Sequence, residues 1–158
     1  MSKLATINRK LYPQHLFHGP QWLVLGVNNI CNLHCKMCDV GTQQLDTNFA
    51  VNLVGTHPLH MPLELFQRIA DQTKKYYPNT KLGYAFTEPL VYKHLEESLA
   101  YANKLGLYTA ITTNALNLRQ KADMLVNGGL NKLYISLDGP EDIHNEIRGH
   151  KSSHQRAL

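Results

Sequence analysis

Residues 22–38 read WLVLGVNNICNLHCKMC, an apolar run followed by three closely spaced cysteines. The near-continuous apolar segment at 22–27 predicts a strand that is covered on both faces of a parallel sheet. Cys31, Cys35 and Cys38 follow in the loop after that strand. In parallel α/β sheets, ligands bind outside the carboxyl ends of the strands. The sequence therefore predicts that these thiols lie at a functional site.

The rest of the chain alternates between strand and helix patterns. The predicted strands are 22–27, 82–86, 107–112 and 133–137, and the predicted helices are 63–77, 95–105 and 118–126. From the second strand onward, the strand starts are about 26 residues apart, which is typical of βα units. Such units form a parallel sheet with right-handed crossovers. We therefore expect an α/β fold.

The connection between the first two predicted strands is longer than the others and contains all three cysteines. Long connections inside compact domains are usually functional or disordered. A short helix is expected over 140–147 and another over 152–158. We expect an N-terminal extension over 1–20 and a core domain over 21–158. Because four strands make an open arc and not a closed barrel, we expect this core domain to be incomplete at its C-terminus.

Composition excludes several classes of protein. The 158 residues are 43% hydrophobic and 18% charged, a globular profile, with a net charge of +4. No apolar run approaches the ~20 residues of a membrane-spanning helix, and the first ten residues lack a signal-peptide core. We therefore expect a cytoplasmic location and no membrane partner. The positive charge is scattered, which suits an anionic small molecule better than a nucleic acid.

Three thiols within eight residues suggest a metal site. Thiolates are soft ligands for iron–sulfur clusters or zinc. At this spacing they can bind three irons of a compact cluster and leave the fourth open to a substrate. A structural zinc site usually has two separated ligand pairs. The chain has no second cysteine pair, and His34 inside the run is poorly placed to complete a tetrahedron. The spacing favours iron–sulfur over zinc or unliganded thiols.

The Cys-x3-Cys-x2-Cys pattern after the first strand resembles the radical S-adenosylmethionine (radical SAM) enzymes. Further matching motifs are Thr87-Glu88-Pro89, Thr112-Thr113-Asn114, Ser136-Leu137-Asp138-Gly139-Pro140, His144 and Ile147-Arg148-Gly149. They resemble the family's Gly-Gly-Glu-Pro, Thr-Asn-Gly and Ser-x-Asp-Gly-Pro…His-Asp-x-x-Arg-Gly motifs. The last run is similar to the branch that contains peptide maturases and molybdopterin-precursor synthases. The resemblance covers about residues 20–150.

The resemblance implies the first four strands of a partial (β/α)6 barrel, similar to a TIM barrel. It also implies that Cys31, Cys35 and Cys38 hold a 4Fe–4S cluster whose open iron binds SAM. An external electron donor would reduce the cluster, and SAM cleavage would give a 5′-deoxyadenosyl radical that abstracts hydrogen from a peptide or small metabolite. Two alternatives remain: an iron–sulfur electron-transfer or sensor protein, and a zinc-stabilised binding module.

The resemblance also assigns SAM contacts, but it assigns no catalytic side chain. The cofactor-binding set is Met37, Glu88, Asn114, Ser136, Asp138 and Arg148. Glu88 would accept from the SAM amino group, and Arg148 would pair with the SAM carboxylate in a bidentate fork. Ser136 would reach the ribose or carboxylate side, and Met37 would lie near the adenine.

Some of these residues also have ordinary structural explanations. Glu88 could be a solvated loop residue, and Asp138 could only cap the following helix. His144 could lie on a helix surface. Arg148 could pair with Glu146 or Asp142.

The chain departs from the family pattern at several positions. Ala85-Phe86-Thr87 and Ala115 stand where relatives carry glycines, and Asn145 replaces an aspartate. Met37 replaces a residue that is commonly aromatic. None of these changes removes a candidate cluster ligand.

Overall fold

The computed structural model describes residues 3–12, 14, 19–42, 48 and 57–158. Parts of the predicted N-terminal extension and residues 43–47 and 49–56 of the long connection lie outside this set. Among the described residues, no helix combines the length and apolar character needed to cross a bilayer.

The centre of the molecule is a four-stranded parallel sheet in the order β1-β2-β3-β4. Its strands are β1 (Trp22–Leu25), β2 (Lys81–Tyr84), β3 (Thr109–Thr113) and β4 (Lys132–Ile135). Each strand pairs with the next along the chain, so the order follows the sequence. The predicted α/β class and the rhythm of βα units are confirmed, and the strand ends differ from the predicted ones by no more than two residues.

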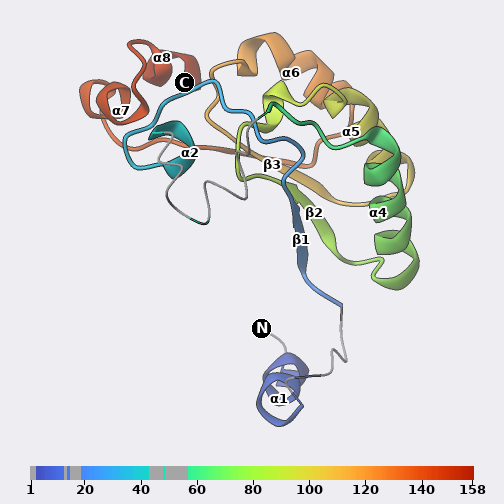
Figure 1. Cartoon of the computed structure of the whole chain (residues 1–158). Coiled ribbons are helices and arrows are strands. Elements are labelled where there is room, and N and C mark those ends of the chain that lie inside the picture. Colours follow the sequence, from blue (N-terminus) through green and yellow to red (C-terminus); the bar gives the residue numbers. More distant parts are fainter. Residues whose placement is uncertain (1–2, 13, 15–18, 43–47, 49–56) are drawn as a thin grey trace.

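Three helices cover one face of this sheet (Figure 1). They are α4 (Leu63–Tyr76), α5 (Leu95–Lys104) and α6 (Leu118–Asn127). Their apolar stripes meet the sheet in a core where Phe66, Tyr84, Leu99 and Ile111 are fully buried. The Phe66 and Tyr84 rings stack with centroids 5.7 Å apart. Each such side chain contributes about 1.5–3 kcal/mol by leaving water, so this face provides most of the fold's hydrophobic stabilisation.

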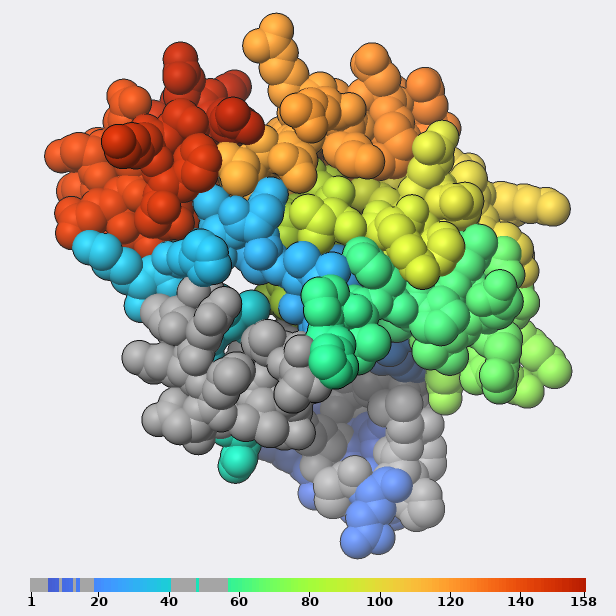
Figure 2. All heavy atoms as spheres, turned by 45° about the horizontal axis from the view of Figure 1, so that its top comes forward, coloured from blue at the N-terminus to red at the C-terminus, as the bar shows by residue number. Residues whose placement is uncertain are grey.

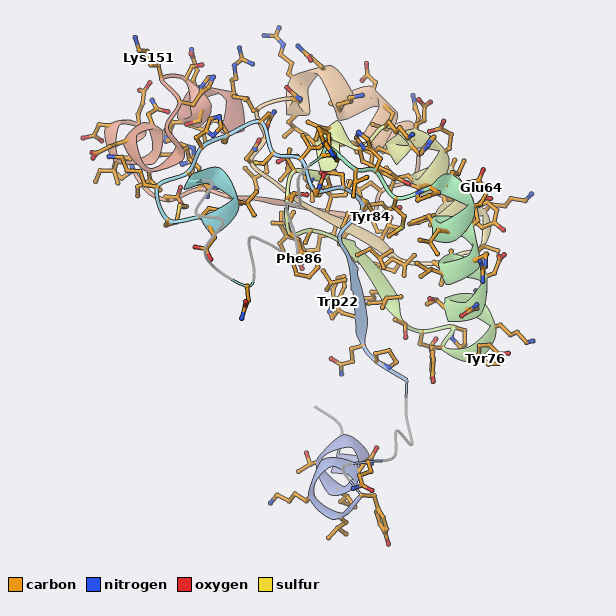
Figure 3. The ribbon with its side chains drawn as sticks, viewed as in Figure 1. Trp22, Glu64, Tyr76, Tyr84, Phe86 and Lys151 are labelled. Carbon is orange, nitrogen blue, oxygen red and sulfur yellow. The ribbon has the colours of Figure 1, made fainter. Side chains whose placement is uncertain are left out.

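None of the described helices covers the opposite face of the sheet. Trp22 and Val24 of β1 are 37% and 45% exposed on it. Figure 3 shows Tyr84 directed toward α4, with Trp22 and Phe86 on the other side of the sheet. The prediction that 22–27 is buried on both faces is therefore wrong, because the helices form a single layer.

The other helices that the structure describes lie outside this layer. They are α1 (Lys3–Leu11), α2 (Asp39–Thr42), the 3-10 helix η1 (Pro89–Val91), α7 (Glu141–Arg148) and α8 (Ser153–Ala157). Figure 1 shows α1 apart from the sheet, beyond the amino end of β1, and α2, α7 and α8 near the carboxyl ends of the strands. Three of the described helices, α2, α7 and α8, thus lie at the carboxyl edge of the sheet.

Asn145 ties α7 to α8. Its Oδ1 accepts from Ser153 Oγ (2.8 Å) and from the His154 N–H (2.9 Å), while its Nδ2 donates to the Lys151 carbonyl (2.9 Å). An aspartate could accept the first two bonds, but it has no N–H for the third. The structure therefore gives a physical reason for asparagine at this position.

Candidate functional site

The three cysteines lie on the loop that connects β1 to α2. Cys35 is buried, Cys31 and Cys38 are half-buried, and none of these three cysteines forms a disulfide. The Cys38 N–H donates to the Cys35 carbonyl (3.2 Å), so the loop turns tightly between these two residues. Burial raises the pKa of the Cys31 and Cys35 thiols, and the Arg148 guanidinium opposes this rise at Cys35.

The donor chemistry of this loop suits an iron–sulfur cluster. Within the described part of the chain, no three His, Cys, Asp or Glu side chains converge on a single metal ion. Thiolates that each bind a different iron of one cluster do not need such convergence. Three soft sulfur donors on one half-buried loop therefore fit a cluster that is held through three of its irons.

Asn28 joins the end of β1 to the segment after β2. Its Nδ2 donates to the Glu88 carbonyl (3.1 Å), and its Oδ1 accepts from the Ile30 N–H (2.7 Å) and from Thr87 Oγ1 (2.9 Å). Asn28 is only 5% exposed. Sequence reasoning missed this residue. The available signal was a polar side chain directly after a buried strand, where an unpaired amide would be costly.

Glu88 is buried at the carboxyl edge, with 1% of its surface exposed. Its Oε1 accepts from the Leu90 N–H (2.9 Å) and from Thr113 Oγ1 (2.7 Å), and its Oε2 accepts from the Asn114 N–H (2.8 Å). Burial raises the pKa of this carboxyl, although the three donors oppose the shift. The explanation of Glu88 as a solvated loop residue is wrong. The side chain instead links the end of β2 to the end of β3.

Asn114 extends this link to the cysteine loop. Its Nδ2 donates to Asn32 Oδ1 (2.8 Å) and lies 3.9 Å from Cys31 Sγ, while its Oδ1 accepts from the Leu116 N–H (2.9 Å). The structure therefore brings Asn114 and Glu88 together, at the side of the loop that carries Cys31. Thr113, which sequence reasoning left out of the site, is the residue through which β3 meets Glu88.

Arg148, the last residue of α7, approaches Cys35, and its partner Asp138 lies on the segment before that helix. Arg148 Nε and Nη2 donate to the two carboxylate oxygens of Asp138 (2.5 and 2.9 Å), and its Nη1 lies 3.9 Å from Cys35 Sγ. The Arg148 and Asp138 side chains are 12% and 21% exposed. The predicted bidentate fork exists, but in this structure its partner is Asp138. The contact of Arg148 with the SAM carboxylate stays a prediction.

The structure also contradicts two simpler explanations, that Arg148 pairs with Glu146 and that Asp138 caps α7. Arg148 does not pair with Glu146, which binds Lys36 Nζ (2.8 Å) instead. The residue at the N-cap of α7 is Pro140, and no side chain caps that end, so Asp138 does not act as the cap.

His144 is fully buried behind this pair, not on a helix surface. Its Nδ1 accepts from the Asp138 N–H (3.2 Å), which places the proton of the neutral ring on Nε2. Burial lowers the pKa of His144, so the ring is neutral near pH 7. Its Nε2 finds no hydrogen-bond partner within the described residues.

Met37 and Ser136 complete the predicted set. Met37 is 57% exposed on the cysteine loop. Ser136 follows β4, is half-buried, and donates its N–H to the Thr113 carbonyl (3.0 Å). Their predicted contacts with SAM stay predictions.

The backbone has a glycine-like conformation at two of the departures from the family pattern. Phe86 has φ 83° and Ala115 has φ 64°, both in the left-handed region. For residues other than glycine this conformation costs about 1–2 kcal/mol. Such strain gathers at functional sites. Phe86 and Ala115 therefore adopt, at the carboxyl edge, a backbone conformation that favours glycine.

The fold and the site together define an α/β protein whose three thiols lie at the carboxyl edge of a parallel sheet. The chain belongs to the radical SAM superfamily, whose family profile matches residues 26–158. It is 31% identical over 124 residues to GTP 3′,8-cyclase from Mycolicibacterium smegmatis, a match that covers 77% of this chain and 32% of the cyclase.

Solved structures with the same fold include SuiB from Streptococcus suis. SuiB bound to the precursor peptide SuiA has a TM-score of 0.69 at 22% identity, covering 96% of this chain and 32% of SuiB. SuiB bound to S-adenosylmethionine has a TM-score of 0.68 at 21% identity, covering 96% of this chain and 33% of SuiB. The open sheet is thus that of a partial radical SAM barrel. The chain spans about a third of the length of these relatives.

Proposed function

We propose that this chain carries the cluster- and SAM-binding part of a radical SAM enzyme, with residues 21–158 as its core domain. The observation that carries the proposal is the convergence of two family motifs on the cysteine loop. Asn114 after β3 lies beside Cys31, and Arg148 at the end of α7 lies beside Cys35. Residues far apart in sequence are thus gathered beside two of the three thiols.

In this proposal Cys31, Cys35 and Cys38 hold a 4Fe–4S cluster, and SAM binds at its open iron. When bound, the cluster would supply the electron for the reductive cleavage of SAM to methionine and a 5′-deoxyadenosyl radical, after its own reduction by an external donor. The protein holds and orients these groups and excludes water. Cysteines that form no disulfide suit a reducing compartment such as the cytoplasm, where we place the protein in this proposal.

Within the site, the Glu88 carboxylate positions Asn114 by accepting a hydrogen bond from the Asn114 N–H. Glu88 is also the proposed acceptor for the SAM amino group. Met37 and Ser136 are candidates for the adenine and the ribose or carboxylate side. The substrate is proposed to be a peptide or a small metabolite. The name of the relative GTP 3′,8-cyclase supports a small metabolite. The structure of SuiB with its bound precursor peptide supports a peptide.

Anaerobic reconstitution with iron and sulfide tests the proposal. We expect a brown protein with thiolate-to-iron absorption that converts SAM to 5′-deoxyadenosine when a chemical reductant is added. A cluster without deoxyadenosine would instead support an electron-transfer or sensor protein. A colourless protein that binds zinc stoichiometrically would support the zinc-stabilised module. Either outcome would reject radical SAM activity for this chain.

A further inference from the structure

The C-terminal end of α7 makes several separate contacts with the cysteine loop. The Lys36 N–H donates to the Ile147 carbonyl (2.8 Å), and Lys36 Nζ pairs with Glu146 Oε1 (2.8 Å). In Figure 2 the blue-to-cyan surface of the loop segment lies directly against the red surface of the C-terminal helices. The loop is therefore held by α7 as well as by the strands.

Gly149 permits the close approach of these two segments. Its φ is +66°, and a Cβ atom at this position would stand 2.8 Å from the His34 carbonyl oxygen. Both the left-handed conformation and the missing side chain are needed there. The residue immediately before it, Arg148, is consequently held at short range from Cys35.

Arg148 is fixed in direction by its partner. Asp138 accepts from Nε and Nη2, which leaves Nη1 as the nitrogen that faces Cys35 Sγ at 3.9 Å. Asp138 is itself positioned by the bond from its N–H to Nδ1 of buried His144. A guanidinium whose other two nitrogens are engaged has little freedom to turn away from the sulfur.

We propose that Arg148 is a hydrogen-bond donor to the Cys35 thiolate and sets the reduction potential of the cluster that this thiolate ligates. The inference rests on the proposed function, because it requires a cluster at Cys35. Reduction adds negative charge to the cluster. A cation and an N–H donor at a ligating sulfur stabilise the reduced state and raise the potential. Asp138 is the positioning residue that keeps Arg148 in this orientation.

The test measures the potential and not the turnover. The whole chain and its variants are reconstituted anaerobically, and the reduced-cluster signal is followed by electron paramagnetic resonance in a redox titration. Arg148→Gln removes the charge and the guanidinium donor, and we expect its midpoint potential to be more negative than that of the wild type. Arg148→Lys keeps the charge but loses the fork, so its potential should lie between the two.

Lys151→Gln is the matched control. It removes one positive charge from the segment between α7 and α8, where Lys151 is exposed and points away from the site (Figure 3). Its potential should equal that of the wild type. A wild-type potential in Arg148→Gln, at equal iron and sulfide content, would overturn the inference.

Two further outcomes are also decisive. If Arg148→Gln does not hold a cluster, the potential of Arg148→Lys decides the question in the same way. If neither variant holds one while Lys151→Gln does, Arg148 serves the folding of the loop, and its assignment as a donor that sets the potential is rejected. A wild-type chain that binds no cluster would reject the proposed function itself.

Discussion

Two groups of residues contact the cysteine loop at different cysteines, and they differ in chemistry. The glutamate support consists of Asn28, Glu88, Thr113 and Asn114, and it reaches Cys31. The arginine support consists of Asp138, His144 and Arg148, and it reaches Cys35. The first centres on a carboxyl that is 1% exposed, whereas the second is an ion pair whose side chains are 12% and 21% exposed.

The difference in burial predicts that the two supports have different roles at the site. Each member of the glutamate support is buried and hydrogen-bonded, so removing its central acceptor leaves donors without partners. The ion pair of the arginine support is partly open to solvent, which screens its charges and lowers its contribution to stability. We therefore expect the glutamate support mainly to determine folding stability and the arginine support mainly to determine the electrostatics at Cys35.

The largest expected effect lies on the loop between the two supports. Replacing Cys31, Cys35 or Cys38 singly with Ala should abolish the bound cluster, because the chain contains only three cysteines and none is spare. Iron and sulfide content after anaerobic reconstitution measures the effect. A single variant that keeps a full cluster and SAM cleavage would show that its cysteine is not a ligand.

Glu88→Ala should lower the free energy of unfolding by about 2–5 kcal/mol, because it leaves buried donors unpaired and creates a cavity. Denaturant unfolding of the cluster-free chain measures the change. Glu96→Ala on the exposed side of α5 is the matched control, with an expected loss below about 1 kcal/mol. Equal losses in the two variants would remove the distinction between a buried support and a surface glutamate.

The carboxyl of Glu88 should also give the glutamate support a recognisable pH dependence. Its pKa in the folded state is raised above the ordinary 4.5, so the folded chain holds this proton more tightly than the unfolded chain does. The stability that Glu88 contributes is then fully present below pH 4.5 and is lost as the pH rises through the raised pKa. Unfolding measured across this range in wild type and Glu88→Gln should show the loss only in the wild type.

The arginine support should respond to pH in the opposite direction. The pKa of His144 is lowered from the ordinary 6.5, so protonation favours the unfolded chain. The free energy of unfolding should fall as the pH drops below about 6.5, and His144→Asn should reduce this dependence. An unchanged slope in His144→Asn would mean that another group titrates there.

The smallest expected effect concerns backbone strain next to the glutamate support. Ala115 is buried with φ 64°, a conformation that glycine adopts without the steric penalty. Ala115→Gly should raise the free energy of unfolding by about 0.5–1 kcal/mol, after the entropic cost of glycine is subtracted. Thermal unfolding detects the change, and a destabilised variant would show that the methyl group's packing outweighs the strain.

Hydrophobic periodicity predicted most of the fold, and the family motifs lie at the carboxyl ends of the strands, as the sequence predicted. The apolar runs and their spacing gave four parallel strands in chain order, because buried strands and amphipathic helices leave distinct patterns. The number of covered faces could not be predicted, since Val24 is apolar whether a helix covers it or not. Apolar side chains are common on protein surfaces, so their presence does not prove burial.

The candidate site divides in the same way. The sequence by itself determined the three thiols, their spacing and their place after the first strand, because these are properties of local order along the chain. Only the tertiary structure decided that Asp138 accepts the two hydrogen bonds of the Arg148 guanidinium. It also decided that Asn28 and Thr113 belong to the site. Those contacts join residues from different strands and loops. Their partners depend on which polar atoms folding buries together, and local sequence does not encode that.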